Sequence, residues 1–253
     1  MQGRLVIRLL RSLVSGSFFV AYGAGSVLVG VFLLPVAALC GSRRGRGRRM
    51  RATVRATYRM FTGAARLVRL FRVESPDFGA LRSIRGRVVA ANHLTLIDIV
   101  VLMSIIPDST CVVKGAAASN PFLRWIVRPL YLVRGEDTEK ILGEATEMLK
   151  EGVNVIIFPE GTRTPADAPS HPMKRGFARI ALAAGVPVAP VRIACDPPVL
   201  AKGQPWYDVG DREIVFTLEA LPEIPVSGTS THAAAAALAS AAGRAIFGKE
   251  TMQ

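Results

Sequence analysis

The chain has 253 residues, which is long for one compact domain and short for two. Half of its residues are hydrophobic and only 20% are charged, a composition that excludes an intrinsically disordered protein. The net charge of +13 is unevenly distributed. Fourteen arginines and no lysine precede Glu74, the first acidic residue, so the N-terminal part carries +14 and the remainder −1. We therefore expect a basic N-terminal region joined to a nearly neutral domain.

The basic region contains an uncharged run from Ser12 to Cys40. As a helix this run would extend about 43 Å, which exceeds the roughly 30 Å hydrocarbon core of a bilayer. We expect a tilted or kinked membrane span with a kink at Pro35; a re-entrant helix is the alternative, because small residues are frequent in the run. A signal peptide would have a much shorter apolar stretch. More arginines follow the run than precede it, which predicts that the chain after Cys40 is cytoplasmic.

Residues 42–73 are expected to form a basic amphipathic helix. At about 100° per residue, one side of the helix is apolar and an adjoining side carries the arginines. The apolar side comprises Val54, Tyr58, Phe61, Ala65 and Val68, continued by Met60, Ala64, Leu67 and Phe71. Such a helix suits the headgroup layer of an anionic membrane; the alternative is a solvated charged face on an ordinary packed helix. Nucleic acid is not an expected partner, because stacking aromatics are not interleaved with the basic residues.

The rest of the chain, 74–253, is predicted to be the catalytic domain, after a membrane anchor in 1–41 and the amphipathic helix in 42–73. Short strand-like runs alternate with helical ones from Ser83 onward, which indicates an α/β fold. A turn at 206–208, a strand at 213–218 and an alanine-rich helix at 231–247 complete it. The three cysteines have no paired spacing that would support disulfides or a zinc ribbon, which favours a cytosolic domain.

A first polar cluster follows the predicted buried strand 87–91. The segment from Asn92 to Asp98 turns this strand into a helix that Thr95 can cap, so that His93 and Asp98 can face each other. A carboxylate fixes the tautomer of an imidazole and stabilises the imidazolium, which suits general-base chemistry. Alone, this spacing favours a structural histidine.

A second cluster follows the predicted buried strand 153–157. Pro159 ends the strand, Gly161 permits close backbone approach, and Arg163 presents a bidentate donor suited to phosphate. Polar clusters at two strand ends predict one crevice at the carboxyl edge of the sheet.

Together, Asn92-His93-x4-Asp98 and the Phe-Pro-Glu-Gly-Thr-Arg run at 158–163 resemble the 1-acylglycerol-3-phosphate acyltransferase (lysophospholipid acyltransferase) family. The resemblance extends from about Arg87 to Ile193. It includes weaker blocks at 131–134, which lacks the usual preceding glycine, 174–176 and 186–191. It implies a mixed central sheet flanked by helices, the glycerolipid acyltransferase fold.

The resemblance also assigns roles to residues. It implies that His93 deprotonates a glycerol hydroxyl that attacks an acyl thioester, and that Asp98 orients His93. The implied acceptor-binding residues are Arg134, Glu160, Gly161, Thr162 and Arg163, with both arginines on the phosphate. Asn92 is expected to support the site by local hydrogen bonds. No bound cofactor or metal is expected, and the oxyanion donors are not identifiable from the sequence.

Other reactive side chains are expected to be secondary. Cys111 is predicted to be a buried strand residue, so no acyl-enzyme is expected. Lys114 and Arg124 can face an acidic acyl carrier protein or the phosphates of coenzyme A, although a solvated role is also open. His171 and His232 are expected to be structural or exposed.

The resulting hypothesis is a membrane-bound acyltransferase that converts a lysophospholipid, most simply 1-acylglycerol-3-phosphate, with acyl-coenzyme A or acyl carrier protein as donor. The arginine-rich, lysine-poor composition suggests a bacterium and thus its inner membrane, with the catalytic domain on the cytoplasmic side. Three runs, 105–114, 120–122 and 202–207, resemble a bacterial subgroup associated with aryl polyene clusters, so a specialised acceptor or acyl group is an alternative. A membrane-anchored scaffold with a decayed active site is another.

Overall fold

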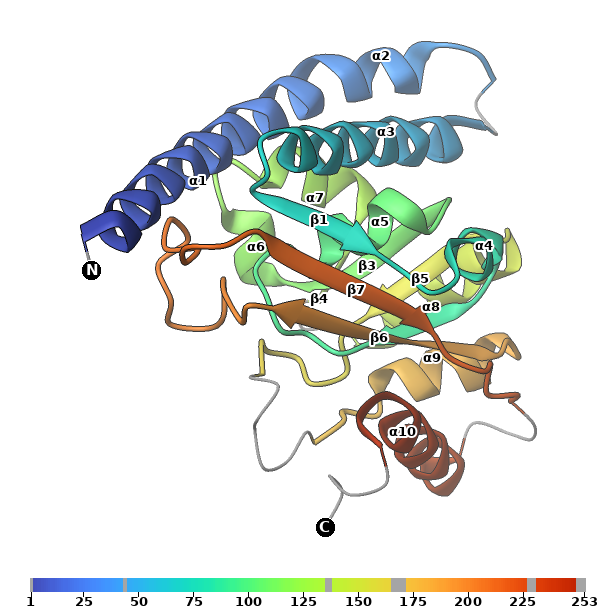
Figure 1. The fold of residues 1–253 in the computed structure, drawn as a ribbon. Helices are drawn as coiled ribbons and strands as arrows, with labels where there is room; N and C mark the ends of the chain where they lie inside the picture. The colour runs from blue at the N-terminus through green and yellow to red at the C-terminus, as the bar shows by residue number, and fades with distance from the viewer. Residues whose placement is uncertain (1, 43–44, 135–137, 165–171, 227–230, 249–253) are drawn as a thin grey trace.

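A computed structural model describes residues 2–42, 45–134, 138–164, 172–226 and 231–248 (Figure 1). Its centre is a seven-stranded sheet with the strand order β1-β7-β6-β2-β5-β3-β4. The strands are β1 (Phe71–Glu74), β2 (Val88–Ala91), β3 (Ser109–Lys114), β4 (Leu132–Arg134), β5 (Asn154–Ile157), β6 (Val188–Asp196) and β7 (Ile214–Ala220). All neighbouring strands are parallel except β6 and β7. The predicted mixed α/β sheet is therefore confirmed.

Helices cover both faces of this sheet (Figure 1). They are α3 (Arg46–Leu67), α4 (Phe78–Ser83), α5 (Asp98–Ile105), α6 (Gly115–Ser119), α7 (Arg124–Leu130), α8 (Thr138–Lys150), α9 (Gly176–Ala184) and α10 (His232–Phe247). Successive residues of β2 enter different cores: Val89 and Ala91 pack with α3, α5 and α7, whereas Val88 and Ala90 pack with α8, α9 and α10. A strand buried on both faces explains why residues 88–91 are uniformly apolar.

One long helical segment lies along the outside of the domain (Figure 1). It consists of α1 (Gln2–Leu28), a π-helical stretch (Val29–Leu33) and α2 (Leu34–Leu39). Among the described residues, Val6–Leu39 is the helix that is long and apolar enough to cross a membrane, by length and composition. We expected a kink at Pro35, and the helix is instead π-helical in the turn before it. Proline has no N–H to donate to a carbonyl oxygen of the preceding turn, which disturbs the α-helical bonding there. Entry of this segment into a bilayer stays a prediction.

Three glycines of this segment, spaced by seven residues, face aromatic side chains of the domain. The pairs are Gly16–Trp206, Gly23–Phe122 and Gly30–Trp125. A Cβ at Gly30 would lie 2.8 Å from the backbone carbon and oxygen of Trp125, so no other residue fits there without a shift. Seven residues are about two helical turns, which places the three glycines on one side of the segment. We call these positions the glycine seats.

Polar contacts hold both ends of the segment to the domain. Arg8 donates to both carboxylate oxygens of Asp208, at 3.1 and 2.5 Å. At the other end, Arg49 of α3 donates from Nε to the carbonyl oxygen of Ala37, at 2.9 Å. The segment therefore lies along the domain instead of projecting from it.

Helix α3 is amphipathic, as expected within 42–73, but its apolar side faces the protein, which matches the alternative of an ordinary packed helix. Its predicted lipid-facing side is buried in the protein core; the buried residues are Val54, Tyr58, Phe61 and Ala65. Met60 and Leu67, assigned to the same side, are instead 71% and 86% exposed. The predicted domain boundary at 73/74 falls inside β1, which pairs with β7. The chain from α3 onward is thus one structural unit.

Candidate active site

The two polar clusters leave the sheet at the same edge. Strands β2 and β5 are neighbouring parallel strands, with Ala90 in register with Ile157, and their carboxyl ends lead into the two motifs. Two hydrogen bonds then join the segments: Thr164 N donates to His93 O at 2.8 Å, and His93 N donates to Glu160 Oε1 at 2.9 Å. The single crevice predicted from the strand ends is therefore present.

His93 and Asp98 contact each other directly. Nδ1 of His93 lies 2.8 Å from Oδ2 of Asp98, which is fully buried. That oxygen also accepts from the backbone N–H groups of Leu94 and Thr95, at 2.7 and 2.8 Å, and the hydroxyl of Thr95 donates to Oδ1. These donors fix the carboxylate, which in turn holds the proton on Nδ1 and leaves Nε2 as an acceptor.

Thr95 has a different role from the expected helix cap. Helix α5 begins at Asp98, its N-cap residue is Ile97, and no side chain caps it. The hydroxyl of Thr95 instead donates to the carboxylate of Asp98. The correction follows from the tight turn, which brings three successive donors onto one carboxylate before the helix starts.

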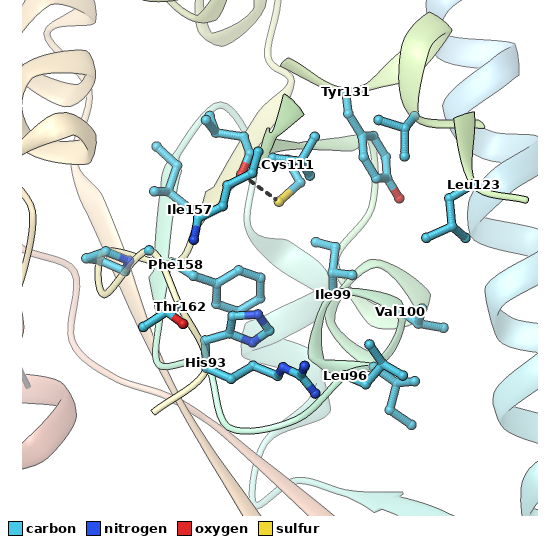
Figure 2. A pocket seen from close by; sticks show the side chains of 18 of the residues that line it. His93, Leu96, Ile99, Val100, Cys111, Leu123, Tyr131, Ile157, Phe158 and Thr162 are labelled. Atoms are coloured by element: carbon cyan, nitrogen blue, oxygen red, sulfur yellow. Dashed lines mark hydrogen bonds between the residues drawn. The ribbon is translucent and has the colours of Figure 1, made fainter. Parts of the chain in front are cut away.

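Neighbouring side chains fix the imidazole ring and its segment. Phe158 stacks on His93 with ring centroids 4.2 Å apart and an interplanar angle of 19°. Figure 2 shows this pair beside Leu96, Ile99 and Val100. The buried Asn92 exchanges two hydrogen bonds with the backbone of Ile193 in β6, at 2.7 and 2.8 Å. Asn92 thus holds the end of β2 against β6 and takes the supporting role expected of it.

Glu160 lies behind the turn. Its side chain is buried, Oε1 accepts from His93 N, and Oε2 has no hydrogen-bond partner among the described residues. Burial raises the pKa of this carboxyl group, and the nearby Thr164 side chain and the backbone N–H of His93 oppose that shift. Glu160 is not among the residues that line the cavity described below. Its geometry fits the expected ordering of the pocket better than direct contact with an acceptor.

Arg163 contacts a loop that sequence reasoning missed. We call residues 197–208, which follow β6, the strap. Nη1 of Arg163 donates to the carbonyl oxygens of Leu200 and Ala201 in the strap, at 3.0 and 3.2 Å. Leu96 N also donates to Leu200 O, at 3.0 Å. The strap continues to Trp206, whose carbonyl oxygen accepts from the Ser15 hydroxyl of α1 at 3.2 Å. It therefore links α1 to the candidate active site, through backbone carbonyls that no sequence pattern reveals.

A cavity of about 760 Å³ opens beside His93. One part is apolar and includes Ile99, Val100, Leu123 and Ile126, with Phe19, Tyr22 and Gly23 of α1 forming its roof. The other part contains basic side chains, namely Lys114, Arg163, Lys174, Arg179 and Lys202. Within the described chain, no aspartate or glutamate lines the cavity. We call the two parts the apolar end and the cationic end.

Other predicted residues fall in different places. Gly161, with φ of 69°, Thr162 and Lys114 line the cavity, whereas Arg124 instead lies over the ring of Trp125, at 4.7 Å. Arg134 ends β4 in register with Lys114, and its side chain lies outside the described residues.

Among the described residues, neither Cys111 nor His232 forms a nucleophile–base pair. Cys111 is buried at the apolar end, and burial raises the pKa of its thiol. The described residues around it include no base within hydrogen-bond distance; its thiol contacts the carbonyl oxygen of Val112 (Figure 2). His232 is exposed beside Arg175 at the start of α10, and His171 lies outside the described residues. Of the described histidines, His93 is therefore the one that lines the cavity.

The apolar end also contains an unexpected pair of tyrosines. The hydroxyls of Tyr58 and Tyr131 lie 2.8 Å apart, and Tyr131 also donates to the sulfur of Met103 at 3.2 Å. Burial raises the pKa of both phenols. Tyr58 was assigned to a lipid-facing helix side, and its 73-residue separation from Tyr131 leaves no local signal for this pairing.

This site has the architecture of an acyltransferase domain. Residues 72–194 match the family model described as Acyltransferase, and this part of the chain belongs to that family. The match begins in β1 and ends in β6, so it includes both motifs.

Individual relatives define the similarity further. A chloroplastic 1-acyl-sn-glycerol-3-phosphate acyltransferase from Brassica napus, BAT2, is 32% identical over 111 residues, which are 42% of this chain and 32% of that protein. Human 1-acyl-sn-glycerol-3-phosphate acyltransferase alpha is 26% identical over 151 residues, or 56% of this chain and 50% of the relative. The chain thus matches between a third and a half of the length of these proteins.

The fold is shared with a solved structure. The crystal structure of the 1-acyl-sn-glycerophosphate acyltransferase PlsC from Thermotoga maritima superimposes with a TM-score of 0.71. The superposition covers 95% of both chains at 24% sequence identity. The fold similarity therefore includes the N-terminal helical segment as well as the sheet.

Proposed function

We propose that this chain is a membrane-bound acyltransferase that moves an acyl group from a thioester to the hydroxyl of a lysophospholipid, most simply 1-acylglycerol-3-phosphate, giving phosphatidate. The observation that carries the proposal is the cavity. Its lining combines His93 of the His–Asp pair with an apolar end and with a cationic end, and no described aspartate or glutamate lines it. Of the five basic side chains, Arg179 is paired with Glu139, which is not a lining residue. A substrate pair with fatty chains and phosphates matches both ends. The relatives named above carry the same activity in their names.

The proposed chemistry begins at Nε2 of His93. This nitrogen takes the proton of the acceptor hydroxyl while the hydroxyl oxygen attacks the thioester carbonyl carbon. The carbon–sulfur bond then breaks, an ester is formed, and the imidazolium returns the proton to the departing sulfur. Asp98 stabilises the imidazolium formed between these steps. No covalent acyl-enzyme is needed in this sequence.

Acceptor binding is proposed at the cationic end. Arg163 retains its Nε and Nη2 groups for a phosphate, because only Nη1 is bonded to the strap. Gly161 and Thr162 line the same turn, and Arg134 leaves the neighbouring edge of the sheet. Lys114 is placed to meet a second anionic group, such as a phosphate of coenzyme A or of the carrier's prosthetic arm.

We further propose that the N-terminal segment and α3 contact the bilayer. Large apolar side chains are exposed on both, for example Leu13, Leu39 and Leu67 at 69%, 80% and 86%. Because α1 is both the roof of the cavity and an exposed apolar surface, a lipid acceptor can reach His93 from the membrane. Arg49, Arg51 and Arg55 of α3 bond to the protein, whereas Arg46, Arg48, Arg59 and Arg66 are exposed. These exposed arginines suit an anionic surface, which supports a bacterial inner membrane with the domain on the cytoplasmic side.

Transfer in liposomes tests the function. The full chain is reconstituted with a mixed pool of lysolipids and with labelled acyl-coenzyme A or acyl carrier protein, and the products are identified by mass spectrometry. Labelled phosphatidate is expected. Transfer only to another lysolipid, or only of a specialised acyl group, would replace the proposed substrates. Stoichiometric binding of a partner without turnover on any thioester would favour a scaffold instead.

A further inference from the structure

Lys174 lies across Gly161 on the catalytic turn. Its backbone N–H donates to Pro159 O at 2.9 Å, which fixes the start of the segment against the turn. A Cβ added to Gly161 would be 2.8 Å from Nζ of Lys174 and 3.3 Å from its Cδ and Cε. The absence of a side chain at Gly161 is therefore what allows the lysine chain to lie flat there.

The surroundings of this ammonium group suit an anion. Lys174 lines the same cavity as His93 and Arg163, and it has no ion-pair partner in the part of the chain that the structure describes. The turn beneath it is bonded to the backbone of His93 through Thr164. A cation fixed at this position increases the affinity of the cavity for a negative group close to the catalytic base.

The chemistry of the acceptor places such a group there. In 1-acylglycerol-3-phosphate, the reacting hydroxyl is on the carbon next to the one that carries the phosphate ester. When the hydroxyl contacts Nε2 of His93, the phosphate must therefore lie within a short reach of that nitrogen. Arg163 covers only part of this need, because its Nη1 is bonded to the strap. A phosphate has enough acceptor oxygens for a second cation.

We propose that Lys174, seated on Gly161, binds the phosphate of the acceptor together with Arg163 and thereby sets the preference for a phosphorylated acceptor. The inference rests on the proposed function. It assigns Lys174 to the acceptor, while Lys114 is left for the donor side of the cavity.

The test compares Lys174→Ala, Lys174→Arg and the control Lys150→Ala, which removes an exposed charge at the end of α8 away from the cavity. The substrates are lysophosphatidate and an uncharged monoacylglycerol with the same chain. Lys174→Ala should lower kcat/KM for lysophosphatidate by about 10- to 100-fold, the usual cost of a lost charged hydrogen bond. Activity on monoacylglycerol and the KM for the donor should stay unchanged. Lys174→Arg should recover most of the loss, and Lys150→Ala should behave as the unsubstituted chain.

A second variant tests the contact between Lys174 and Gly161. Gly161→Ala should displace the lysine, and it should also lower activity on both acceptors because Gly161 has a φ of 69° that strains any other residue. Only the change in acceptor preference should be less than additive with that of Lys174→Ala, since both changes remove the same contact with the phosphate. In Lys174→Ala, an equal loss on both acceptors, or a raised KM for the donor alone, would overturn the assignment of Lys174.

Direct binding separates this inference from the proposed function. Calorimetric titration with sn-glycerol 3-phosphate needs no turnover, and Lys174→Ala should weaken the binding while Lys150→Ala leaves it unchanged. If the unsubstituted chain transfers acyl groups but Lys174→Ala binds glycerol phosphate normally, only the inference fails. If no thioester is turned over yet the binding difference persists, the acyl transfer fails and the phosphate site remains.

Discussion

The two ends of the cavity are built in different ways. The cationic end is formed by the carboxyl edge of the sheet and the turns that follow it, together with Arg179 of α9, and hydrogen bonds join the segments around His93 and Glu160. The apolar end is formed by side chains of α5, α7 and the α1 roof. Hydrogen-bonded turns fix atoms to a few tenths of an ångström, whereas apolar packing fixes mainly shape and volume.

This difference separates two tasks. Chemistry and charge recognition need fixed distances, and they occur at the end made of strand termini. Binding of an acyl chain needs only space of the right size. That space lies beneath α1, which packs on the domain through the glycine seats. Substitutions at the cationic end should therefore change rates and acceptor choice, whereas those at the apolar end should change which acyl chains are accepted.

The largest effect is expected at the cationic end, from His93→Ala. Removal of the base should lower kcat by about 100- to 10,000-fold, because general-base assistance is worth that much. The initial rate of labelled acyl transfer measures the loss, and circular dichroism checks the fold. His232→Ala is the matched control, since this histidine is exposed at the start of α10. Comparable activity in His93→Ala and the unsubstituted chain would remove His93 from the mechanism.

A smaller and selective effect is expected at the apolar end, from Gly23→Leu. The added side chain meets the ring of Phe122 and fills space beneath the roof. Rates with long acyl donors should fall about 10-fold or more relative to short ones. Each methylene of the acyl chain that no longer fits the pocket raises the activation free energy. A series of donor lengths measures the ratio. Gly25→Leu is the control, because a Cβ there meets nothing within 4 Å. A uniform loss across all lengths would contradict the separation of tasks.

The tyrosine pair should affect stability more than catalysis. Tyr58→Phe or Tyr131→Phe removes the hydrogen bond between the two hydroxyls. Each change should lower the free energy of unfolding by about 1 kcal/mol. The double variant should cost less than the two single changes together. Urea denaturation of the purified chain measures these values. Strict additivity would show that the two hydroxyls do not interact.

The smallest effect is a pH dependence from Glu160. Burial raises its folded-state pKa above the ordinary value of 4.5, so between these two values the folded chain keeps a proton that the unfolded chain has lost. This carboxyl group should therefore reduce stability as the pH rises from about 4.5 towards its folded-state pKa. Glu160→Gln should lack that decrease. Urea unfolding at a series of pH values compares the two chains, and parallel pH profiles would contradict the prediction.

The sequence predicted the catalytic edge well for a physical reason. Strands 88–91 and 154–157 are buried on both faces, so apolar residues mark them apart from Asn154, and the polar residues that follow must lie at the edge. The His93–Asp98 contact follows because both residues belong to one short turn. Residues close in sequence leave a local pattern.

The sequence could not predict contacts that join distant segments. Periodicity showed that one side of α3 is apolar. It could not show whether that side faces the protein core or lipid, because both environments favour the same side chains. In the structure, Tyr58 and Phe61 lie in the core. The strap meets Arg163 through carbonyl oxygens, which every residue has. The sequence marked Lys174 only as part of the weak family block at 174–176. Its position over the catalytic turn depends on the space above Gly161, which no sequence pattern reveals.

The seven-residue spacing of the glycine seats has a consequence for how α1 can change in evolution. A heptad drifts by only about 20° around a straight helix, so three seats remain on one side. Deleting or inserting one residue between two seats would rotate every later seat by about 100° and remove it from its aromatic partner. The outward side chains of α1 are free to vary with the lipid around them. Its length between Gly16 and Gly30 is fixed, because even an insertion of seven residues, which preserves the rotation, would move the later seats about 10 Å along the helix and away from their partners.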